Sequence, residues 1–474
     1  MSRPAAALPL LVSGVLMLVG CAAPPPADKP VTLRQAVRVL VADAPQQGRW
    51  PAERWWQAYN DPDLNELIEL ALANAPSVGA AEGRFATAVE AVRAAGATVG
   101  LQVEGNAGLS RQRLGENGVF PAEFLRFSAY NLATLGVSAR YSFDWWGRQR
   151  AGIAAVVDQS RAADAERRAV TLQLSATVAE QYFGWQHEQQ RLLLVQQRQQ
   201  VLQQQARLHQ QRLAAQVDNA DAGLRIAQEQ AALQSLQAAL QGAAQLRRVA
   251  MAALLGAVDR EIRNPPVKPL PAVEVLLPPS ASLDLIARRP DITASRWRVE
   301  AQQQQLVVER AAYYPDLNLR ALAGLESIEL SKLLQGGSAV PAVGAALHLP
   351  LFDGGLRDAR YGAARTMLRT AIADYDAVVF AAAREVGTAV SNGLTASAQL
   401  RQQDQQLQQL QGLADTAAAR LQAGLTDQRA VLAVHLEQLA SRDARVQLQF
   451  AALAADIALQ RALGGGYHAT EESP

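Results

Sequence analysis

The chain has 474 residues, enough for roughly two to four ordinary domains, and its 45 basic residues almost balance its 44 acidic residues. This balance gives no indication of a nucleic-acid partner. The five histidines lie far apart without metal-ligand spacing, and the single cysteine excludes disulfide bonds within one chain and thiolate clusters, so we expect no metal and no cofactor.

The first 20 residues have the pattern of a secretory signal peptide. Arg3 is the only charge before an apolar run at residues 8–19, which is too short to span a bilayer as a helix. Leu18-Val19-Gly20-Cys21 then resembles a bacterial lipobox, in which the cysteine becomes the acylated N-terminus. We therefore expect residues 21–62 to form a lipid-anchored N-terminal segment with Cys21 as the lipidation site. The alternative is an ordinary signal cleaved after Ala23, which would remove Cys21.

A first repeat of four elements is predicted over residues 63–264. Asn60-Asp61-Pro62 is a helix-start signal, and a helix follows to about residue 97 with a mild interruption near Pro76. Alternating apolar and polar residues then predict a β-hairpin over 98–143 with one apolar and one polar face. Aromatic residues at the hairpin ends favour a membrane barrel. The alternative is a soluble sheet with one face on a core.

The long helix predicted over residues 148–215 is the element around which the chain is organised. It contains no proline, and apolar residues return every seven positions, as in Leu194, Val201 and Leu208. At a rise of about 1.5 Å per residue it makes a rod of roughly 100 Å, which needs partners along its whole length. After a tip, a returning helix is predicted over residues 220–256.

A proline-rich linker at residues 265–282 precedes a second copy of this pattern over residues 283–465. Phe143-Asp144 matches Phe352-Asp353, which lies 209 residues later. We therefore predict an internal two-fold sequence repeat. The elements of the second copy are a helix, a hairpin over 316–352, a long helix over 356–423 and a helix over 427–463, followed by a tail over 466–474.

Four strands per chain pose a closure problem. No stretch after the signal reaches the ~18 apolar residues of a membrane-spanning helix, so a crossing of the membrane would have to use strands. Four strands cannot close a barrel, and open strand edges do not occur in lipid. Three copies would supply twelve strands, which can close.

Six segments in the same order carry a family resemblance. They are residues 54–76 (RWWQAYNDPDLNELIELALANAP), 143–148 (FDWWGR), 287–300 (ARRPDITASRWRVE), 311–319 (AAYYPDLNL), 351–355 (LFDGG) and 420–432. On these segments the chain resembles the TolC-like outer-membrane efflux factor family, in its lipoprotein branch. The resemblance implies an α+β membrane protein: a trimer whose four strands per chain form a shared 12-stranded transmembrane β-barrel, continued by a long periplasmic α-helical barrel.

The resemblance also implies a function. It is the outer-membrane channel of a tripartite efflux pump, a passive exit for drugs or other small toxic compounds, and not an enzyme. The implied partners are a homotrimer, a periplasmic membrane-fusion adaptor, outer-membrane lipid and an inner-membrane pump of the RND class, with a major-facilitator or aromatic-acid exporter as alternatives. The implied location is the outer membrane, lipid-anchored, with a long periplasmic extension. The alternative function is a structural or adaptor-type periplasmic coiled-coil lipoprotein.

Four charged residues near the helix tips form a candidate periplasmic gate: Asp218, Asp221, Asp427 and Arg429. In a trimer each occurs three times, and rings of like charge on a narrow aperture repel unless counter-charges such as Arg429 hold them. Family members often carry an acidic or amide residue nine positions after the glycine equivalent to Gly424; this chain has Ala433 there. The alternative is that Asp221 and Asp427 only cap the returning helices.

Overall fold

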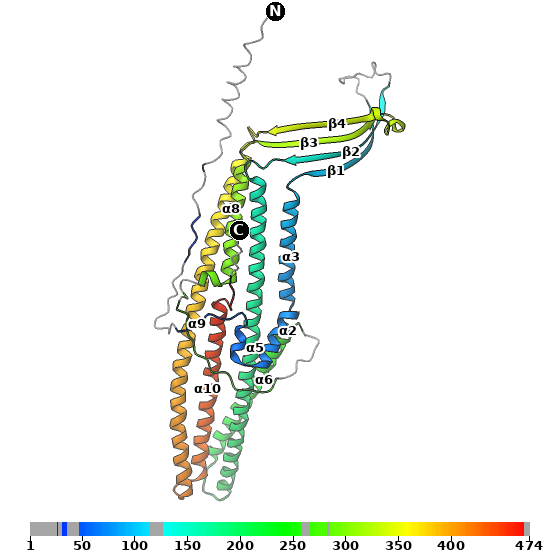
Figure 1. Cartoon of the computed structure of the whole chain (residues 1–474). Helices are drawn as coiled ribbons and strands as arrows, with labels where there is room; N and C mark the ends of the chain where they lie inside the picture. Colours follow the sequence, from blue (N-terminus) through cyan, green and yellow to red (C-terminus); the bar gives the residue numbers. More distant parts are fainter. Residues whose placement is uncertain are drawn as a thin grey trace, which may run out of the picture. The chain divides into compact units, whose positions relative to one another are not determined.

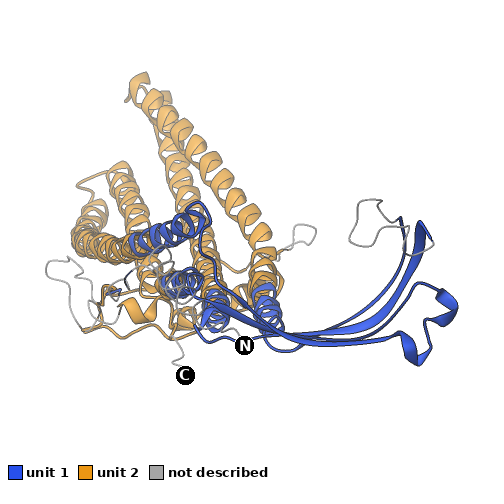
Figure 2. Ribbon diagram, turned by 90° about the horizontal axis from the view of Figure 1, so that it is seen from above, with its two compact units in different colours: residues 1–32, 86–161, 297–373 blue, residues 33–85, 162–296, 374–474 orange. Residues whose placement is uncertain are grey.

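The computed structural model in Figure 1 describes residues 26, 31–35, 47–113, 127–256, 265–279, 281 and 285–468. The chain divides into two compact units, which Figure 2 colours separately. Unit 1 comprises residues 1–32, 86–161 and 297–373, and unit 2 comprises residues 33–85, 162–296 and 374–474. The predicted signal peptide and Cys21 lie outside the described residues, as do residues 114–126 of the first predicted hairpin.

The long helices come in pairs of equal length. In chain order the elements are η2 (Trp55–Tyr59), α2 (Pro62–Asn74), α3 (Pro76–Ala97), β1 (Gln102–Arg113), β2 (Ala129–Ser142), α5 (Arg148–Ala214), α6 (Ala220–Leu254), η3 (Leu285–Arg288), α8 (Pro290–Ala311), β3 (Asp316–Ser327), η4 (Leu330–Lys332), η5 (Gly336–Ser338), β4 (Ala339–His348), α9 (Leu356–Gln422) and α10 (Gln428–Ala462). Helices α5 and α9 have 67 residues each, α6 and α10 have 35, and α3 and α8 have 22. The predicted combination of long helices with four antiparallel strands is confirmed.

The helix expected over residues 63–97 is two helices. Helix α2 begins after Asp61, whose side chain accepts a hydrogen bond from the backbone N–H of Asp63 at 3.1 Å, with Pro62 in the first helical position. It ends at Asn74, and α3 starts at Pro76. A proline has no N–H to continue the hydrogen-bond ladder of α2, and it disfavours helical backbone in the residue before it.

The sheet in unit 1 has the strand order β1-β2-β3-β4, with all three ladders antiparallel. Every registered pair joins two odd-numbered or two even-numbered residues, so one face carries all the odd positions. Val137, for example, pairs with Gly105 on one side and Ala323 on the other. Because side chains alternate along a strand, most apolar residues of the four strands share one face and most polar residues share the other. We call these the odd face and the even face. The exceptions include Leu132, Leu322 and Val340 at even positions and Arg111 and Arg113 at odd positions.

Within unit 2, helix α5 carries two adjacent apolar seams, and each seam serves a different partner helix. Val195 and Leu202 belong to a buried cluster with Leu233 and Leu240 of α6. Val201, the residue before Leu202, is buried with Leu432 and Leu439 of α10. Burying each such side chain contributes about 2 kcal/mol, so the returning helices stabilise the long one along its length. Among the helices that the structure describes, none is both long and apolar enough to cross a membrane.

The predicted linker is attached to the core of unit 2. The Lys268 ammonium lies 2.6 Å from a carboxylate oxygen of Asp61 and 2.5 Å from one of Asp63, and the Tyr182 hydroxyl donates to Asp61 at 2.6 Å. Burial would raise the pKa of Asp61, but the hydrogen bonds from Lys268 and Tyr182 outweigh burial and hold that pKa below its ordinary value.

The division into units does not follow the predicted repeats, since both repeats contribute to both units.

Gly464, which follows α10, allows a test of how closely the chain after α10 packs against η3. Gly464 has a φ of +91°, and a Cβ there would lie 1.8 Å from the carbonyl oxygen of Arg288. Gly424 also has a positive φ, +72°, but a Cβ there would meet nothing within 4 Å. We expect Gly464→Ala to destabilise the protein by about 3 kcal/mol or more, from the left-handed backbone plus the clash, and Gly424→Ala by only about 1–2 kcal/mol. Thermal melting of the purified protein measures both, and equal losses would contradict this packing.

Candidate functional site

The two long helices end in the same way, within unit 2. At the end of α5 the N–H of Val217 donates to the carbonyl of Arg212 at 3.0 Å, and at the end of α9 the N–H of Leu425 donates to that of Arg420 at 2.8 Å. The residue before each donor has left-handed backbone: Gln216 with a φ of +58° and Gly424 with +72°. These are Schellman endings, which turn the chain sharply and satisfy the last carbonyl groups. We call the turns the first tip (residues 215–219) and the second tip (residues 423–427).

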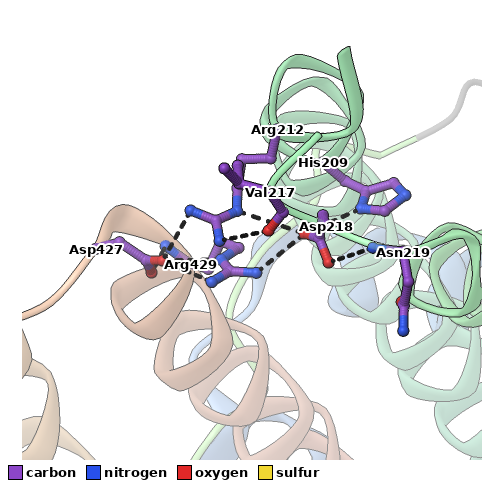
Figure 3. A network of polar contacts seen from close by, with 7 residues as sticks. All are labelled: His209, Arg212, Val217, Asp218, Asn219, Asp427 and Arg429. Carbon is purple, nitrogen blue, oxygen red and sulfur yellow. Dashed lines mark hydrogen bonds and ion pairs between the residues drawn. The ribbon is translucent and has the colours of Figure 1, made fainter. Parts of the chain in front are cut away.

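Asp218 is the centre of a charged network between the tips (Figure 3). One of its carboxylate oxygens lies 3.4 Å from Nδ1 of His209, 3.4 Å from Nε of Arg212 and 3.2 Å from Nη1 of Arg429. Its other oxygen accepts from the backbone N–H of Asn219 at 3.0 Å. The Asp218 side chain is only 14% exposed, so most of its hydrogen-bonding capacity is used within the protein.

Asp427 supplies the second carboxylate and also caps α10. One oxygen accepts from the backbone N–H of Arg429 at 3.0 Å, and the other lies 2.9 Å from Nε and 2.8 Å from Nη2 of the same arginine. Arg212 approaches this second oxygen with Nη1 at 3.9 Å. Arg429, at the start of α10, thus contacts Asp427 of the second tip and Asp218 of the first tip. Arg212, near the end of α5, contacts the same two carboxylates. The two guanidinium groups hold the two tips together.

The network favours the charged forms of Asp218, Asp427 and Arg429. The hydrogen bond from Arg429 lowers the pKa of Asp427, and Asp427 in turn raises the pKa of Arg429. The backbone N–H of Asn219, helped by His209 and Arg212, lowers the pKa of Asp218. Because both carboxyl pKa values are lowered, their contribution to tip stability is complete above the ordinary carboxyl pKa of about 4 and is lost as the pH falls through the lowered values.

Three of the four predicted gate residues therefore meet: Asp218, Asp427 and Arg429. Asp221 does not. It is exposed in the first turn of α6 and has no ion pair or side-chain hydrogen bond with any residue in the described part of the chain. Asp427 does cap α10, but it also pairs with Arg429, so capping is not its only contact. Asp221 is not a cap, because α6 begins at Ala220 and Asn219 holds the cap position. Ala433 is exposed on α10, and its methyl group cannot join the network.

His209 and Arg212 were not among the predicted site residues. They lie three positions apart near the end of α5, a spacing that places both side chains on one face of the helix. The sequence signal for these two residues was a pair of basic side chains in the last turns of a predicted helix, just before an acidic tip. It is weak, because Arg212 also suits a helix C-terminus, where a cation opposes the helix dipole.

The comparisons with known proteins agree with one another. A family model described as "Outer membrane efflux protein" matches residues 67–257 and again residues 282–465. The multidrug resistance outer membrane protein MdtP of Escherichia coli is 31% identical over 472 residues, covering 97% of this chain and 95% of that protein. The structure of the outer-membrane channel OprN has a TM-score of 0.83 at 25% identity, covering 94% of this chain and 99% of that one. The outer membrane protein VceC of Vibrio cholerae has a TM-score of 0.77 at 30% identity, covering 88% and 100%.

Hydrogen exchange at the second tip can separate the two roles of Asp427. Asp427→Ala removes the cap and the ion pairs, and the loss of a cap costs about 1 kcal/mol, so the amides of Arg429 and Ala430 should exchange roughly five-fold faster. Asp427→Asn keeps the cap and should change this exchange much less. Asp221→Ala is the control and should leave the second tip unchanged. Equal acceleration in the alanine and asparagine variants would show that Asp427 acts through charge alone.

Proposed function

Because the chain belongs to the outer membrane efflux protein family, whose members are channels rather than enzymes, we propose that it is the outer-membrane channel of a tripartite efflux pump. It gives drugs or other small toxic compounds a passive path out of the cell. The observation that carries this proposal is the match to the family along both halves of the chain, with a multidrug resistance protein as a relative over nearly the whole length.

The proposed assembly is a homotrimer with a shared twelve-stranded barrel in the outer membrane. The two-faced sheet supports it, because an apolar odd face suits lipid and a polar even face suits a water-filled lumen. The helices would continue the barrel as a tube in the periplasm. In this tube the helices of the first repeat and the equally long helices of the second repeat would surround the channel axis. Equal helix lengths and the two matches of the family model support the internal repeat.

The proposed partners are a periplasmic membrane-fusion adaptor and an inner-membrane pump of the RND class, with a major-facilitator or aromatic-acid exporter as alternatives. Mass spectrometry of material that copurifies with the native protein from membranes distinguishes these classes. The alternative function, an adaptor-type periplasmic coiled-coil lipoprotein, would have no use for a long two-faced sheet.

The charged network at the tips would act as the periplasmic gate. Arg429 bridges Asp218 and Asp427, which lie on different helical hairpins, so in a trimer three such bridges would hold the entrance narrow. Opening the entrance by separating the hairpins would break each bridge. The side chains are partly exposed, and the bridges should therefore weaken as the salt concentration rises.

Bilayer conductance tests this gate and the channel function together. Arg429→Ala breaks both bridges of Arg429 in each chain while Asp427 can still cap α10, so the open probability should rise several-fold. Arg225→Ala removes one exposed positive charge of α6 that has no ion-pair partner among the described residues, and it should leave the open probability at the parent value. A parent that forms no conducting channel contradicts the channel proposal. A channel whose open probability is the same in Arg429→Ala contradicts the gate alone.

The proposal includes a lipid anchor at Cys21, which rests on the lipobox-like residues before it. The mature protein should begin at Cys21 and carry a diacylglyceryl group and an N-acyl chain, and Cys21→Ser should abolish both. Intact-protein mass spectrometry of the membrane fraction measures these additions. An unmodified N-terminus at Pro24 in the native protein would favour the ordinary secretory signal instead.

A further inference from the structure

Two arginines stand directly opposite each other on the even face of the sheet. Arg140 of β2 is the register partner of Arg320 of β3. The other two positions of this row are uncharged: Gln102 on β1 and Gly344 on β4. Like charges directly opposite each other destabilise an antiparallel sheet, so strand pairing does not explain the pair.

The described residues do not neutralise this pair. Both side chains are exposed, and neither guanidinium has a hydrogen bond or an ion pair with a residue that the structure describes. Arginines just beyond the same sheet differ: Arg150 lies 3.3 Å from Asp144, and Arg357 lies 2.6 Å from Asp353. Arg140 and Arg320, by contrast, have no ion-pair partner among the described residues.

The even face also carries three carboxylates, Glu104, Asp316 and Glu326, each the only acidic residue in its row. Glu104 is diagonal to Arg140, with Cα atoms about 7–8 Å apart in such a geometry. Asp316 lies four residues from Arg320, about 14 Å along the strand, and Glu326 is farther away. Exposed charges beyond about 8–10 Å are largely screened at physiological ionic strength. Within that distance the two guanidinium groups outnumber the single carboxylate of Glu104, so the net charge at the arginine row is positive.

A hollow of about 420 Å³ lies over this row. Its lining includes Gln102, Glu104, Ser138, Arg140, Arg320 and Gly344. A Cβ at Gly344 would meet nothing within 4 Å, so the space beside Arg320 is open. The volume is within the roughly 300–1,000 Å³ of small-molecule sites, and Ser138 and Gln102 can add neutral hydrogen bonds.

We propose that Arg140 and Arg320 form a site for carboxylate-bearing organic anions in the lumen of the barrel. The inference rests on the proposed function, because only a closed barrel of three chains turns the pair into a ring of six guanidinium groups. Rings of charged side chains set the selectivity of many pores. Arginine binds a carboxylate through two parallel hydrogen bonds, so this ring selects for the shape of the group as well as for its charge. The substrates of this channel then include compounds that carry a carboxylate.

Reversal potentials in planar bilayers test this selectivity. With potassium benzoate and potassium chloride gradients, the parent channel should prefer each anion over potassium. The double variant Arg140→Gln/Arg320→Gln should lower the benzoate-to-potassium permeability ratio roughly three- to ten-fold. The matched control is Arg111→Gln/Arg113→Gln, which removes two exposed positive charges from β1 at odd positions, and it should change the ratio less than about 1.5-fold. Arg140→Lys/Arg320→Lys should keep the preference for chloride over potassium but lose part of the preference for benzoate over chloride.

Melting experiments keep the proposal testable if a variant conducts poorly. Removing two opposed like charges should leave the melting temperature of the double variant equal to or above that of the parent, and benzoate should raise the melting temperature of the parent more than that of the variant. A conducting parent whose selectivity is unchanged by the double variant, or changed equally by the control, overturns the proposal. A parent with no conductance overturns the proposed function, and the benzoate-dependent melting then decides the anion site by itself.

Discussion

The two outer edges of the four-stranded sheet constrain the rest of this protein. In the described sheet β1 and β4 each pair on one side only, and in lipid an unpaired backbone N–H or C=O group costs several kcal/mol. One chain cannot close four strands, so the proposed channel requires β1 of one copy to pair with β4 of the next. The helices then follow from this requirement: rods that leave a ring of strands side by side must pack on each other, and the two seams of α5 provide that packing within each chain.

The charged groups of the chain follow two opposite rules. At the tips, Arg212 and Arg429 each contact both Asp218 and Asp427, so positive and negative groups are balanced and the tips are held together. On the even face of the sheet, Arg140 and Arg320 face each other without an ion-pair partner among the described residues. Paired charges suit the proposed gate, which must keep the entrance closed and also be able to open. Unbalanced charge destabilises the sheet slightly and leaves guanidinium groups available to solutes.

Periodicity predicted the elements because packing imposes it. The seven-residue repeat of α5 exists because two partner helices bury it, and the alternation of apolar and polar residues predicted the faces of the sheet because side chains alternate along a strand. The network at the tips was harder to predict from the sequence. Asp427 could be recognised as a helix cap from its position, but the start of α6 decides whether Asp221 is a cap, and a shift of two residues changes its role. His209 and Arg212 meet Asp218 only through the geometry of the turn, and the opposition of Arg140 and Arg320 depends on a register between strands from different halves of the chain.

Cysteine cross-linking between β1 and β4 tests the edge-to-edge account most directly. In a Cys21→Ser background, a cysteine replaces Asn106 on β1, and a second cysteine is moved along the even positions of β4, at Val340, Ala342, Gly344 and Ala346 in turn. The account predicts that oxidation gives disulfides between chains at one register, with a ladder on denaturing gels that ends at three chains. No disulfide at any register, or a ladder that continues beyond three chains, would contradict a closed barrel of three copies.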